Sequence, residues 1–399
     1  MKVLIEELLI DGIRASRRIR RKIVGDPALR AQTLVQEATT VLAAAGLRPH
    51  GDESPPRLRL AERTDAGALI SFVELERDVV VIKTAGSPSA RASLDREARV
   101  LHALADHPGL ASFRRLIPAV LAEGVVDETS YVVISAVPGT AGSTFLRHPA
   151  LRRRAILAAA RAARDLHTRT GRTRAIGVGD VDRWTKDPLR RLARAIQSPP
   201  SGALIAGVEQ DLREGLVGRE ATIGWIHGDY WFGNVLLSPN ASAVLGLVDW
   251  DLAEPAALPS CDLVHLAVMS RAIAGRSQFG DVVTNLLDGS GWPALDREIL
   301  EAGGVRFQDE RHERSVLLIT WLRHVAANLA QSADYSRRKV WMRRNVDEVL
   351  RSLEVTHRTP SRVSGNPDRA PDQARRRRQP DRSTRSHPGT EPSGRRVLG

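Results

Sequence analysis

The sequence predicts an α+β protein with two lobes, a sheet-rich one followed by a larger helical one. Short runs of apolar and β-branched residues fill residues 57–82, whereas apolar residues recur at helical spacing over most of the chain after Pro138-Gly139. With 399 residues, of which 42% are hydrophobic and 27% charged, the chain is long enough to bury a substantial core. We expect the two lobes to join at about residue 136.

The elements are expected in a definite order along the chain. Residues 1–50 show helical spacing that closes at Gly46, and a linker rich in Pro and Gly follows. We expect strands over 57–62, 68–75, 78–83 and 131–135, a helix over 89–104, and a strand pair near 234–249 within the helical part. Beyond Val355 large apolar residues are nearly absent, which predicts disorder. The predicted domains are an N-terminal extension (1–56), an N-lobe (57–135), a C-lobe (136–355) and a basic tail (356–399).

The net charge of +12 is concentrated at the two ends of the chain. Residues 356–399 contain 11 Arg and 4 acidic residues, a net of +7, which leaves 12 − 7 = +5 for residues 1–355. The basic runs at 17–22 and 375–378 contain no interleaved aromatic residues, so they do not predict specific nucleic-acid binding. We therefore expect only weak, salt-sensitive association of these ends with polyanions.

Features that depend on the cellular compartment predict a cytoplasmic protein. The single cysteine, Cys261, excludes an intramolecular disulfide framework. No apolar stretch approaches the ~20 residues that a membrane span needs. The apolar start MKVLIEELLI is interrupted by Glu6, Glu7 and Asp11 too early for a secretory signal.

The segment 225–255 contains the residues that point to chemistry. Two strand-like runs flank a turn at 239–242, and if Ser238 pairs with Ala243, Asn234 falls opposite Leu247. Asp249 then lies about one strand step from Asn234.

This arrangement predicts a metal site beside a base. Asn234 and Asp249 supply hard oxygen ligands of the kind that suit Mg²⁺, which binds one or two carboxylates together with substrate phosphates. Asp229, five residues before Asn234, is free to orient a hydroxyl group and accept its proton.

These residues resemble the aminoglycoside phosphotransferase family, the small-molecule branch of the protein-kinase-like fold. His227-Gly228-Asp229 through Asn234 is similar to the family's catalytic loop, and residues 248–251 are similar to the segment where protein kinases carry Asp-Phe-Gly. The resemblance extends from about residue 57 to residue 355. It implies a bilobal kinase-like fold, ATP and Mg²⁺ as cofactors, and transfer of the γ-phosphate to a hydroxyl group of a small molecule.

The same resemblance assigns residues upstream and downstream of the loop. It implies that Lys83, at the end of a strand, binds the nucleotide phosphates and is held by Glu97 on the next helix. Backbone groups near Ser135 and Val137 would meet an adenine, and Asp262 would support the catalytic loop. The turn at 63–67 has one glycine where protein kinases have several, so no residue there is assigned to the phosphates.

Several residues near the motif have more than one reading. His227 is better read as a hydrogen-bonding residue that orients the loop than as the base. Asp251 fits a metal ligand or a cap equally well, and Trp231 and Phe232 fit substrate contact or packing. A late helix, which could line a substrate cleft, contains Trp321, Arg323 and His324. Positions in the core or at the rim of the cleft are the favoured reading of these three residues.

Charge suggests the kind of acceptor. Residues 262–355 contain 13 acidic and 13 basic residues, with no acidic excess for a polycationic aminoglycoside. Trp321 and His324 suit the face of a neutral sugar as well as a cation. We therefore expect a sugar or sugar-like acceptor. The alternatives are an aminoglycoside antibiotic kinase and a kinase-fold protein that binds nucleotide without turnover.

Overall fold

The computed structural model describes residues 27–47, 56–63, 67–75, 78–196, 201–332 and 334–358. The chain divides into two units, Met1–Arg358 and Thr359–Gly399, and the described residues all belong to the first. The predicted helical residues before Pro27, most of the linker, the turn at 64–66, the two basic runs and the tail after Arg358 lie outside the described residues.

The N-lobe is built on a five-stranded antiparallel sheet. Its strand order is β1-β2-β3-β5-β4. The strands are β1 (Arg57–Arg63), β2 (Leu69–Leu75), β3 (Asp78–Ala85), β4 (Val120–Val126) and β5 (Thr129–Ser135). The expected strands are confirmed, and β4 is an addition. A two-residue turn at Asp127 and Glu128, both with positive φ, joins β4 to β5 in the manner of a type I′ hairpin.

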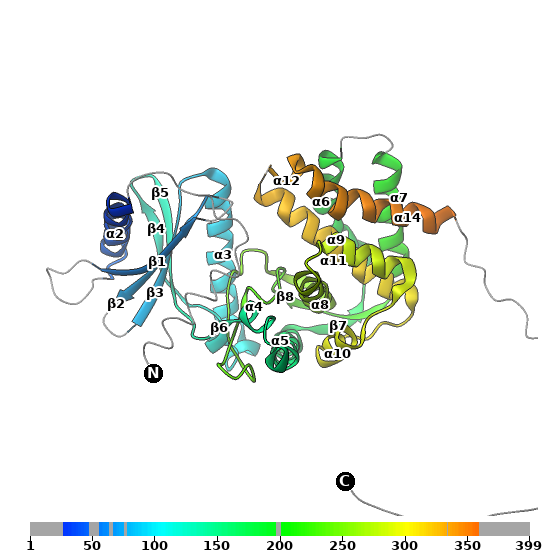
Figure 1. The fold of residues 1–399 in the computed structure, drawn as a ribbon, viewed down its shortest axis with the longest axis horizontal. Coiled ribbons are helices and arrows are strands. Elements are labelled where there is room, and N and C mark those ends of the chain that lie inside the picture. The colour runs from blue at the N-terminus through cyan, green and yellow to red at the C-terminus, as the bar shows by residue number, and fades with distance from the viewer. Residues whose placement is uncertain are drawn as a thin grey trace, which may run out of the picture. The chain divides into compact units, whose positions relative to one another are not determined.

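The two faces of this sheet are covered by different helices (Figure 1). Successive side chains of a strand point to opposite faces, and β3 shows this clearly. Val80 and Ile82 pack with α2 (Pro27–Ala44), whereas Val81 packs with α3 (Pro88–Asp106) in the main core. Lys83 shares the face of Val81 and therefore points toward α3. Ser87 caps the N-terminus of α3, because its hydroxyl accepts from an amide of the first turn.

The C-lobe is mainly helical. Its longer helices are α5 (Pro149–Thr170), α6 (Val178–Ala195), α7 (Ser201–Leu216), α8 (Ser260–Gly275), α10 (Ala294–Ala302), α11 (Glu310–Gln331) and α14 (Glu348–Arg358). Shorter helices of this lobe are α4 (Gly142–Phe145), α9 (Phe279–Asn285), α12 (Asp334–Arg337), α13 (Lys339–Met342) and the π-helical η3 (Leu286–Ser290) and η4 (Arg343–Asp347). The 3₁₀ turns η1 (Pro108–Leu110) and η2 (Arg114–Leu116) lie between α3 and β4 of the N-lobe. The predicted mainly helical part is thus confirmed, and α14 continues beyond Val355.

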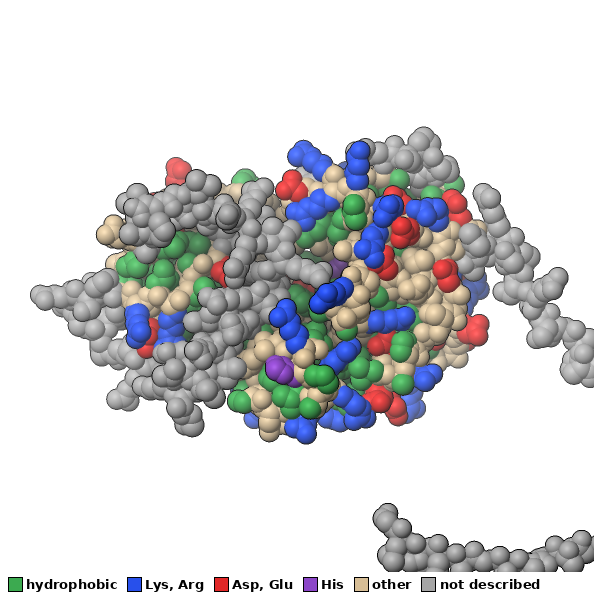
Figure 2. All heavy atoms as spheres, in the orientation of Figure 1, with side chains coloured by type: hydrophobic (Ala, Val, Ile, Leu, Met, Phe, Trp, Pro, Cys, Tyr) green, Lys and Arg blue, Asp and Glu red, His purple; other side chains and the backbone are tan. Residues whose placement is uncertain are grey.

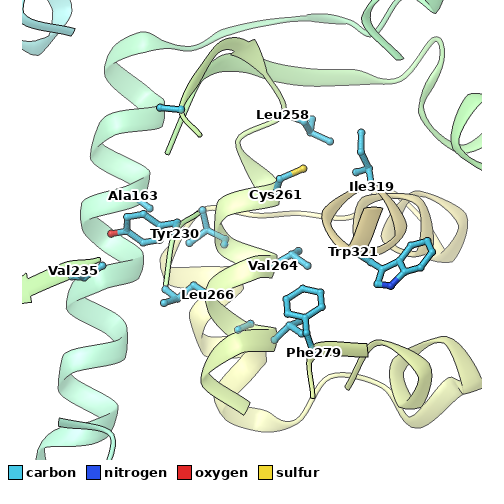
Figure 3. Packing of buried hydrophobic residues seen from close by; sticks show 14 of the residues in the cluster. Ala163, Tyr230, Val235, Leu258, Cys261, Val264, Leu266, Phe279, Ile319 and Trp321 are labelled. Atoms are coloured by element: carbon cyan, nitrogen blue, oxygen red, sulfur yellow. The ribbon is translucent and has the colours of Figure 1, made fainter. Parts of the chain in front are cut away.

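Buried aromatic side chains fill the core of this lobe. Trp250, Trp321, Tyr230 and Phe232 are almost fully buried. Figure 3 shows Tyr230 beside α5 and Trp321 on α11, with residues of α8 packed between them. The Tyr230 hydroxyl donates to the carbonyl oxygen of Ala159 at 2.8 Å, which satisfies its polar end. This packing fixes the loop that contains Tyr230.

Two small sheets lie within the C-lobe. The expected strand pair is present as β9 (Val235–Leu237) and β10 (Val244–Leu247), and β6 (Thr140–Ala141) adds a third strand. The second sheet, β7 (Arg172–Ala175), β8 (Glu220–Ile226) and β11 (Glu254–Ala257), was not expected from the sequence. Its exposed outer strand β7 has no alternation of apolar and polar residues, which is the signal that marks a strand.

The hairpin of β9 and β10 begins in the predicted register. The amide of Ser238 donates to the carbonyl oxygen of Ala243 at 2.9 Å. A β-bulge before Gly246 then adds one residue to β10. Glycine suits this position because a Cβ there would lie 2.6 Å from the side chain of Val137.

The extra residue changes what lies opposite Asn234. Leu247 pairs with Val235, so the expectation that Asn234 would face Leu247 is wrong by one position. The amide of Val248 instead donates to the carbonyl oxygen of Asn234 at 3.0 Å. Asp249 therefore follows directly after the residue that is bonded to Asn234.

Candidate active site

The loop between β8 and β9 has as its second residue a glycine that has no room for a side chain. Gly228 has a φ of 80°, and a Cβ at this position would overlap the carbonyl oxygen of Leu252. The amides of His227 and Gly228 both donate to the carboxylate of Asp262, at 2.8 and 3.0 Å. The loop therefore turns tightly around one carboxylate.

Asp262 is buried on α8 and has a further partner. His167 Nε2 lies 3.0 Å from Asp262 Oδ2. Burial by itself raises the pKa of Asp262, but the hydrogen bonds from His167 and the loop amide, with nearby positive charge, more than offset burial and lower it. A carboxylate that stays charged is a firm acceptor for the two loop amides, as expected for a residue that supports the loop.

His227 has the orienting contacts that its sequence position indicates. Its Nε2 lies 3.0 Å from the carbonyl oxygen of Val248, and its ring packs against Tyr230 and Trp250. The ring faces a carbonyl group, so Nε2 is the donor. His227 thus ties the loop to the strand that leads to Asp249.

Asp229 presents a partly exposed carboxylate at the centre of the loop. Its Oδ2 accepts from Asn234 Nδ2 at 3.0 Å and from Trp231 Nε1 at 3.2 Å, while 35% of the side chain is exposed. Burial of the loop, and then the negative charge of Asp249, raise the pKa of Asp229 above its ordinary value. Asp229 is a positioned carboxylate whose proton affinity is increased.

Lys83 joins carboxylates from both lobes. Its Nζ lies 2.7 and 2.6 Å from the two oxygens of Glu97 on α3, and 3.0 Å from Asp249 Oδ1. Burial alone lowers the pKa of Lys83, but Glu97 and Asp249 outweigh burial and raise it. Lys83 is therefore a buried, permanently charged ammonium group.

The residues after β10 have unusual backbone and side-chain contacts. Asp249 has a φ of 62°, a left-handed conformation that is rare for a residue with a side chain. Asp251 Oδ2 accepts from the hydroxyl of Ser93 on α3 at 2.6 Å. Asp251 thus forms a second contact between this segment and α3, and its reading as a metal ligand stays a prediction.

The expected hinge lies after β5. The amide of Ser135 donates to the carbonyl oxygen of Ala119 at 2.9 Å, so this amide is not available to a ligand. Ala136 donates to Val79 at 3.1 Å, whereas no hydrogen bond of the Val137 amide occurs among the described residues. The Val137 side chain packs with a small apolar cluster, Ala141, Leu236 and Val248.

The donor set fits a magnesium ion only together with a substrate. Asn234 uses its amide nitrogen on Asp229, at 3.0 Å from both the backbone and a side-chain oxygen, which turns its carboxamide oxygen away from the loop. In the part of the chain that the structure describes, no three His, Cys, Asp or Glu side chains form a metal-binding group. Two oxygen ligands from Asn234 and Asp249 suit Mg²⁺ when phosphates and water complete the shell.

Two aromatic residues are not where a substrate would meet them. Trp321 is fully buried, and its Nε1 donates to the carbonyl oxygen of Asn345 at 2.7 Å, so the suggestion that it offers a face to a sugar is wrong. Phe232 is likewise buried in the core. His324 is half-buried beside Phe279, with ring centroids 4.0 Å apart.

Three contacts to the site were not found from the sequence. His167 bonds Asp262, Ser93 bonds Asp251, and His265 Nδ1 lies 3.2 Å from the carbonyl oxygen of Tyr230. His265 had a usable signal, because a residue three positions after Asp262 on a helix shares its face. His167 and Ser93 come from distant segments, and no local pattern indicates them.

The two-lobed α+β fold and this loop-and-hairpin site define a kinase-like class of protein. The sequence profile of the phosphotransferase enzyme family matches residues 65–298. The chain therefore belongs to the phosphotransferase enzyme family, which confirms the resemblance to aminoglycoside phosphotransferases and the kinase-like fold.

Solved structures similar to this chain include two aminoglycoside phosphotransferases. Aminoglycoside phosphotransferase APH(3'')-Id from Streptomyces rimosus, solved with ADP and streptomycin, is 20% identical, with coverage of 72% of this chain and 98% of that one and a TM-score of 0.46. The GDP complex of wild-type aminoglycoside 2'-phosphotransferase-IIIa is 16% identical, with coverage of 81% and 99% and a TM-score of 0.47. No curated protein sequence matches this chain significantly. None of the described helices is both long and apolar enough to cross a bilayer.

Proposed function

We propose that this phosphotransferase uses ATP and Mg²⁺ and moves the γ-phosphate to a hydroxyl group of a small, sugar-like molecule. The observation that carries the proposal is the position of Lys83, whose ammonium group contacts Glu97 of one lobe and Asp249 of the other. Phosphoryl transfer needs a fixed cation beside a metal ligand and close to a base. Lys83, Asp249 and Asp229 supply these three groups.

The nucleotide would lie between the sheet and the C-lobe. Lys83, held by Glu97, would bind the α- and β-phosphates. The amide of Val137, which has no partner among the described residues, would donate to the adenine ring, and the Ser135 carbonyl would accept from it. The apolar cluster that contains Val137 and Leu236 would pack against the base.

Asn234 and Asp249 would hold Mg²⁺ through their side-chain oxygens. When bound, the ion neutralises charge on the transferring phosphate. The residues themselves supply alignment: the backbone bond between Asn234 and Val248 fixes the spacing of both side chains.

Asp229 would act on the acceptor. Asn234 and Trp231 hold its Oδ2, so Oδ1 is the oxygen that can receive the proton of an acceptor hydroxyl. The acceptor oxygen then attacks the γ-phosphorus, the bond to the β-phosphate oxygen breaks, and ADP leaves.

Ion pairing in the C-lobe favours a neutral acceptor. Three acidic side chains of the C-lobe have arginine partners, namely Glu254 with Arg323 (3.0 Å), Asp309 with Arg219 (2.7 Å) and Asp281 with Arg344. On the face shown in Figure 2, acidic side chains of the helical lobe are interspersed with basic ones and form no separate acidic area. A polycationic substrate needs unpaired carboxylates to replace its water.

A side-by-side acceptor assay tests this proposal. The full chain is incubated with ATP·Mg²⁺ and either neutral sugars or kanamycin-like polycations, at low and physiological salt, and phosphorylated products are detected by mass spectrometry. We expect phosphorylation of neutral acceptors. Turnover of polycations alone would reassign the protein as an antibiotic kinase, and nucleotide binding without any transfer would favour the non-catalytic alternative.

A further inference from the structure

Helix α8 contacts the peptide groups on both sides of Asp229. Asp262 receives the amide of Gly228 at 3.0 Å, and His265, one turn later, faces the carbonyl oxygen of Tyr230 at 3.2 Å. Residues three apart on a helix share a face, so a single face of α8 holds both neighbours of Asp229. The direction of the Asp229 side chain follows from these two backbone contacts.

A second helix continues the chain of polar contacts. His265 Nε2 lies 3.1 Å from His324 Nδ1 on α11, and His324 Nε2 lies 3.3 Å from Asn328 Nδ2. Because a carbonyl oxygen only accepts, His265 must carry its proton on Nδ1. If both rings are neutral, His324 Nδ1 must then donate to His265 Nε2, and Asn328 donates to His324 Nε2. Every polar atom of the two rings is satisfied by this one assignment.

The surroundings keep both rings neutral. Phe279 of α9 packs against both rings, and burial lowers the pKa of His265 to about 4 and that of His324 well below its ordinary value. The other charged groups that face His265 are Asp262 on α8, Arg323 on α11 and Asp229 in the loop, and only the carboxylates favour a proton.

We propose that His265 and His324 are positioning residues that fix the Tyr230 carbonyl and thereby aim the carboxylate of Asp229. The inference rests on the proposed role of Asp229 as the group that receives the acceptor proton. Neither imidazole touches the reacting atoms in this account. They act through the backbone of the loop.

His324 has a specific task in this arrangement. His265 Nε2 lies 3.8 Å from Asp229 Oδ1, just beyond hydrogen-bonding distance. While His324 donates to Nε2, that nitrogen is an acceptor and does not compete for Asp229. Without His324, His265 is free to carry its proton on Nε2, donate to Asp229 Oδ1 and leave the Tyr230 carbonyl without a donor. The oxygen proposed to receive the acceptor proton would then be occupied.

The test compares variants that remove different parts of this chain. His324→Phe keeps the ring stacked on Phe279 but removes the donor, His265→Leu removes the whole contact, and His265→Asn retains an amide donor for Tyr230. The control is His312→Phe, because His312 is a buried histidine at the other end of the same helix. Each full-length variant is assayed for phosphate release from ATP·Mg²⁺ with water as acceptor, for nucleotide affinity by calorimetry and for melting temperature.

We expect a loss of turnover without a loss of binding. His324→Phe and His265→Leu should lower kcat about 10- to 100-fold, since a small misplacement of a reacting group has effects of this size, with nucleotide Kd within about twofold. His265→Asn should recover most of the activity, and His312→Phe should change only the melting temperature. Wild-type kcat in folded His324→Phe and His265→Leu would overturn the inference.

A second measurement is independent of any activity. Nitrogen-15 NMR of histidine side chains in the wild-type chain should show both rings neutral at pH 6, with the proton on Nδ1 in each, and His324→Phe should move the His265 proton to Nε2. A His265 ring that carries its proton on Nε2 in the wild type would contradict the proposed hydrogen-bond chain. If NMR finds the hydrogen-bond chain as proposed while wild-type phosphate release is absent or is unaffected by Asp229→Asn, the proposed function is wrong and the hydrogen-bond chain stands.

Discussion

The ammonium nitrogen of Lys83 lies 3.0 Å from Oδ1 of Asp249, and this ion pair joins strand β3 of the N-lobe to the segment after β10 of the C-lobe. Glu97 holds the same nitrogen from α3 at 2.6 Å. One buried cation therefore sets the distance between two carboxylates that come from different lobes. Its removal affects both the fold and the site.

Replacement of Lys83 by methionine should lower stability and nucleotide binding together. The change leaves Glu97 buried without its partner, and breaking a buried ion pair in this way costs about 3 kcal/mol or more. Thermal melting with and without ATP·Mg²⁺ measures both effects. The exposed Lys186→Met is the matched control and should melt like the wild type. An unchanged melting temperature for Lys83→Met would show that the ion pair does not contribute.

Replacement of Asp249 by alanine should weaken the Mg²⁺-dependent part of nucleotide binding. The change removes one of two proposed metal ligands, so the affinity for ATP should fall about tenfold or more in Mg²⁺ and little in EDTA. Calorimetry in the two buffers measures the difference. Asp251→Asn, which changes the group that accepts from Ser93 and leaves both proposed metal ligands in place, should keep the Mg²⁺ dependence. An equal loss in both buffers would mean that Asp249 acts only through Lys83.

Local patterns predicted the parts of the fold that depend on neighbours in sequence. The strands of the N-lobe sheet have the apolar runs that predict them, and Gly228 and Asn234 stand at fixed spacing from Asp229 in a single loop. The bulge before Gly246 was not predictable from the turn. Gly246 packs closely against Val137, which is more than 100 residues away in sequence. A register derived from the turn alone was therefore wrong by one position at Asn234.

The buried polar contacts were harder to predict than the motif. His167 reaches Asp262 across 95 residues, and its contact depends on how α5 packs beside α8. Trp321 illustrates the opposite error, since an aromatic residue on a late helix fits either a substrate or a core and only burial decides. The sequence indicates which chemistry is present, whereas helix packing determines which side chains support it.

Replacement of Gly228 by alanine should displace the loop, beyond the strain of its backbone conformation. The added Cβ would overlap the Leu252 carbonyl oxygen, so the amides that bind Asp262 must move. Gly218→Ala is a close control, because Gly218 has a φ of 81° and open space around it. We expect Gly218→Ala to cost about 1 kcal/mol in unfolding free energy and Gly228→Ala clearly more, with loss of phosphate release. An equal loss of unfolding free energy in the two variants, measured by chemical denaturation, would show that the added Cβ of Gly228→Ala meets no obstacle.

The histidine pair should make the fold less stable in acid. The pKa of His265 is about 4 in the folded chain, below its ordinary 6.5, so the unfolded chain binds more protons between these values. Stability should therefore fall as pH drops from about 7 to 4, by about 3 kcal/mol for this residue alone. Asp296, whose pKa burial raises to about 6, acts in the opposite sense. Chemical denaturation of the wild type and of His265→Leu across this pH range measures the contribution of His265 to the unfolding free energy. Curves of unfolding free energy against pH that run parallel for the two proteins would contradict the prediction.

The rate of phosphate transfer by Asp229→Asn at saturating ATP·Mg²⁺ is the most direct test of the account. The amide keeps the shape of the side chain and an oxygen near Trp231 and Asn234, but it does not accept the proton of an acceptor hydroxyl at Oδ1 as a carboxylate does. We expect kcat to fall by at least about 100-fold, the size of a general-base contribution, while calorimetry finds nucleotide affinity unchanged. Transfer at the wild-type rate, or an equal loss of nucleotide binding, would contradict the assignment of Asp229 as the group that acts on the acceptor.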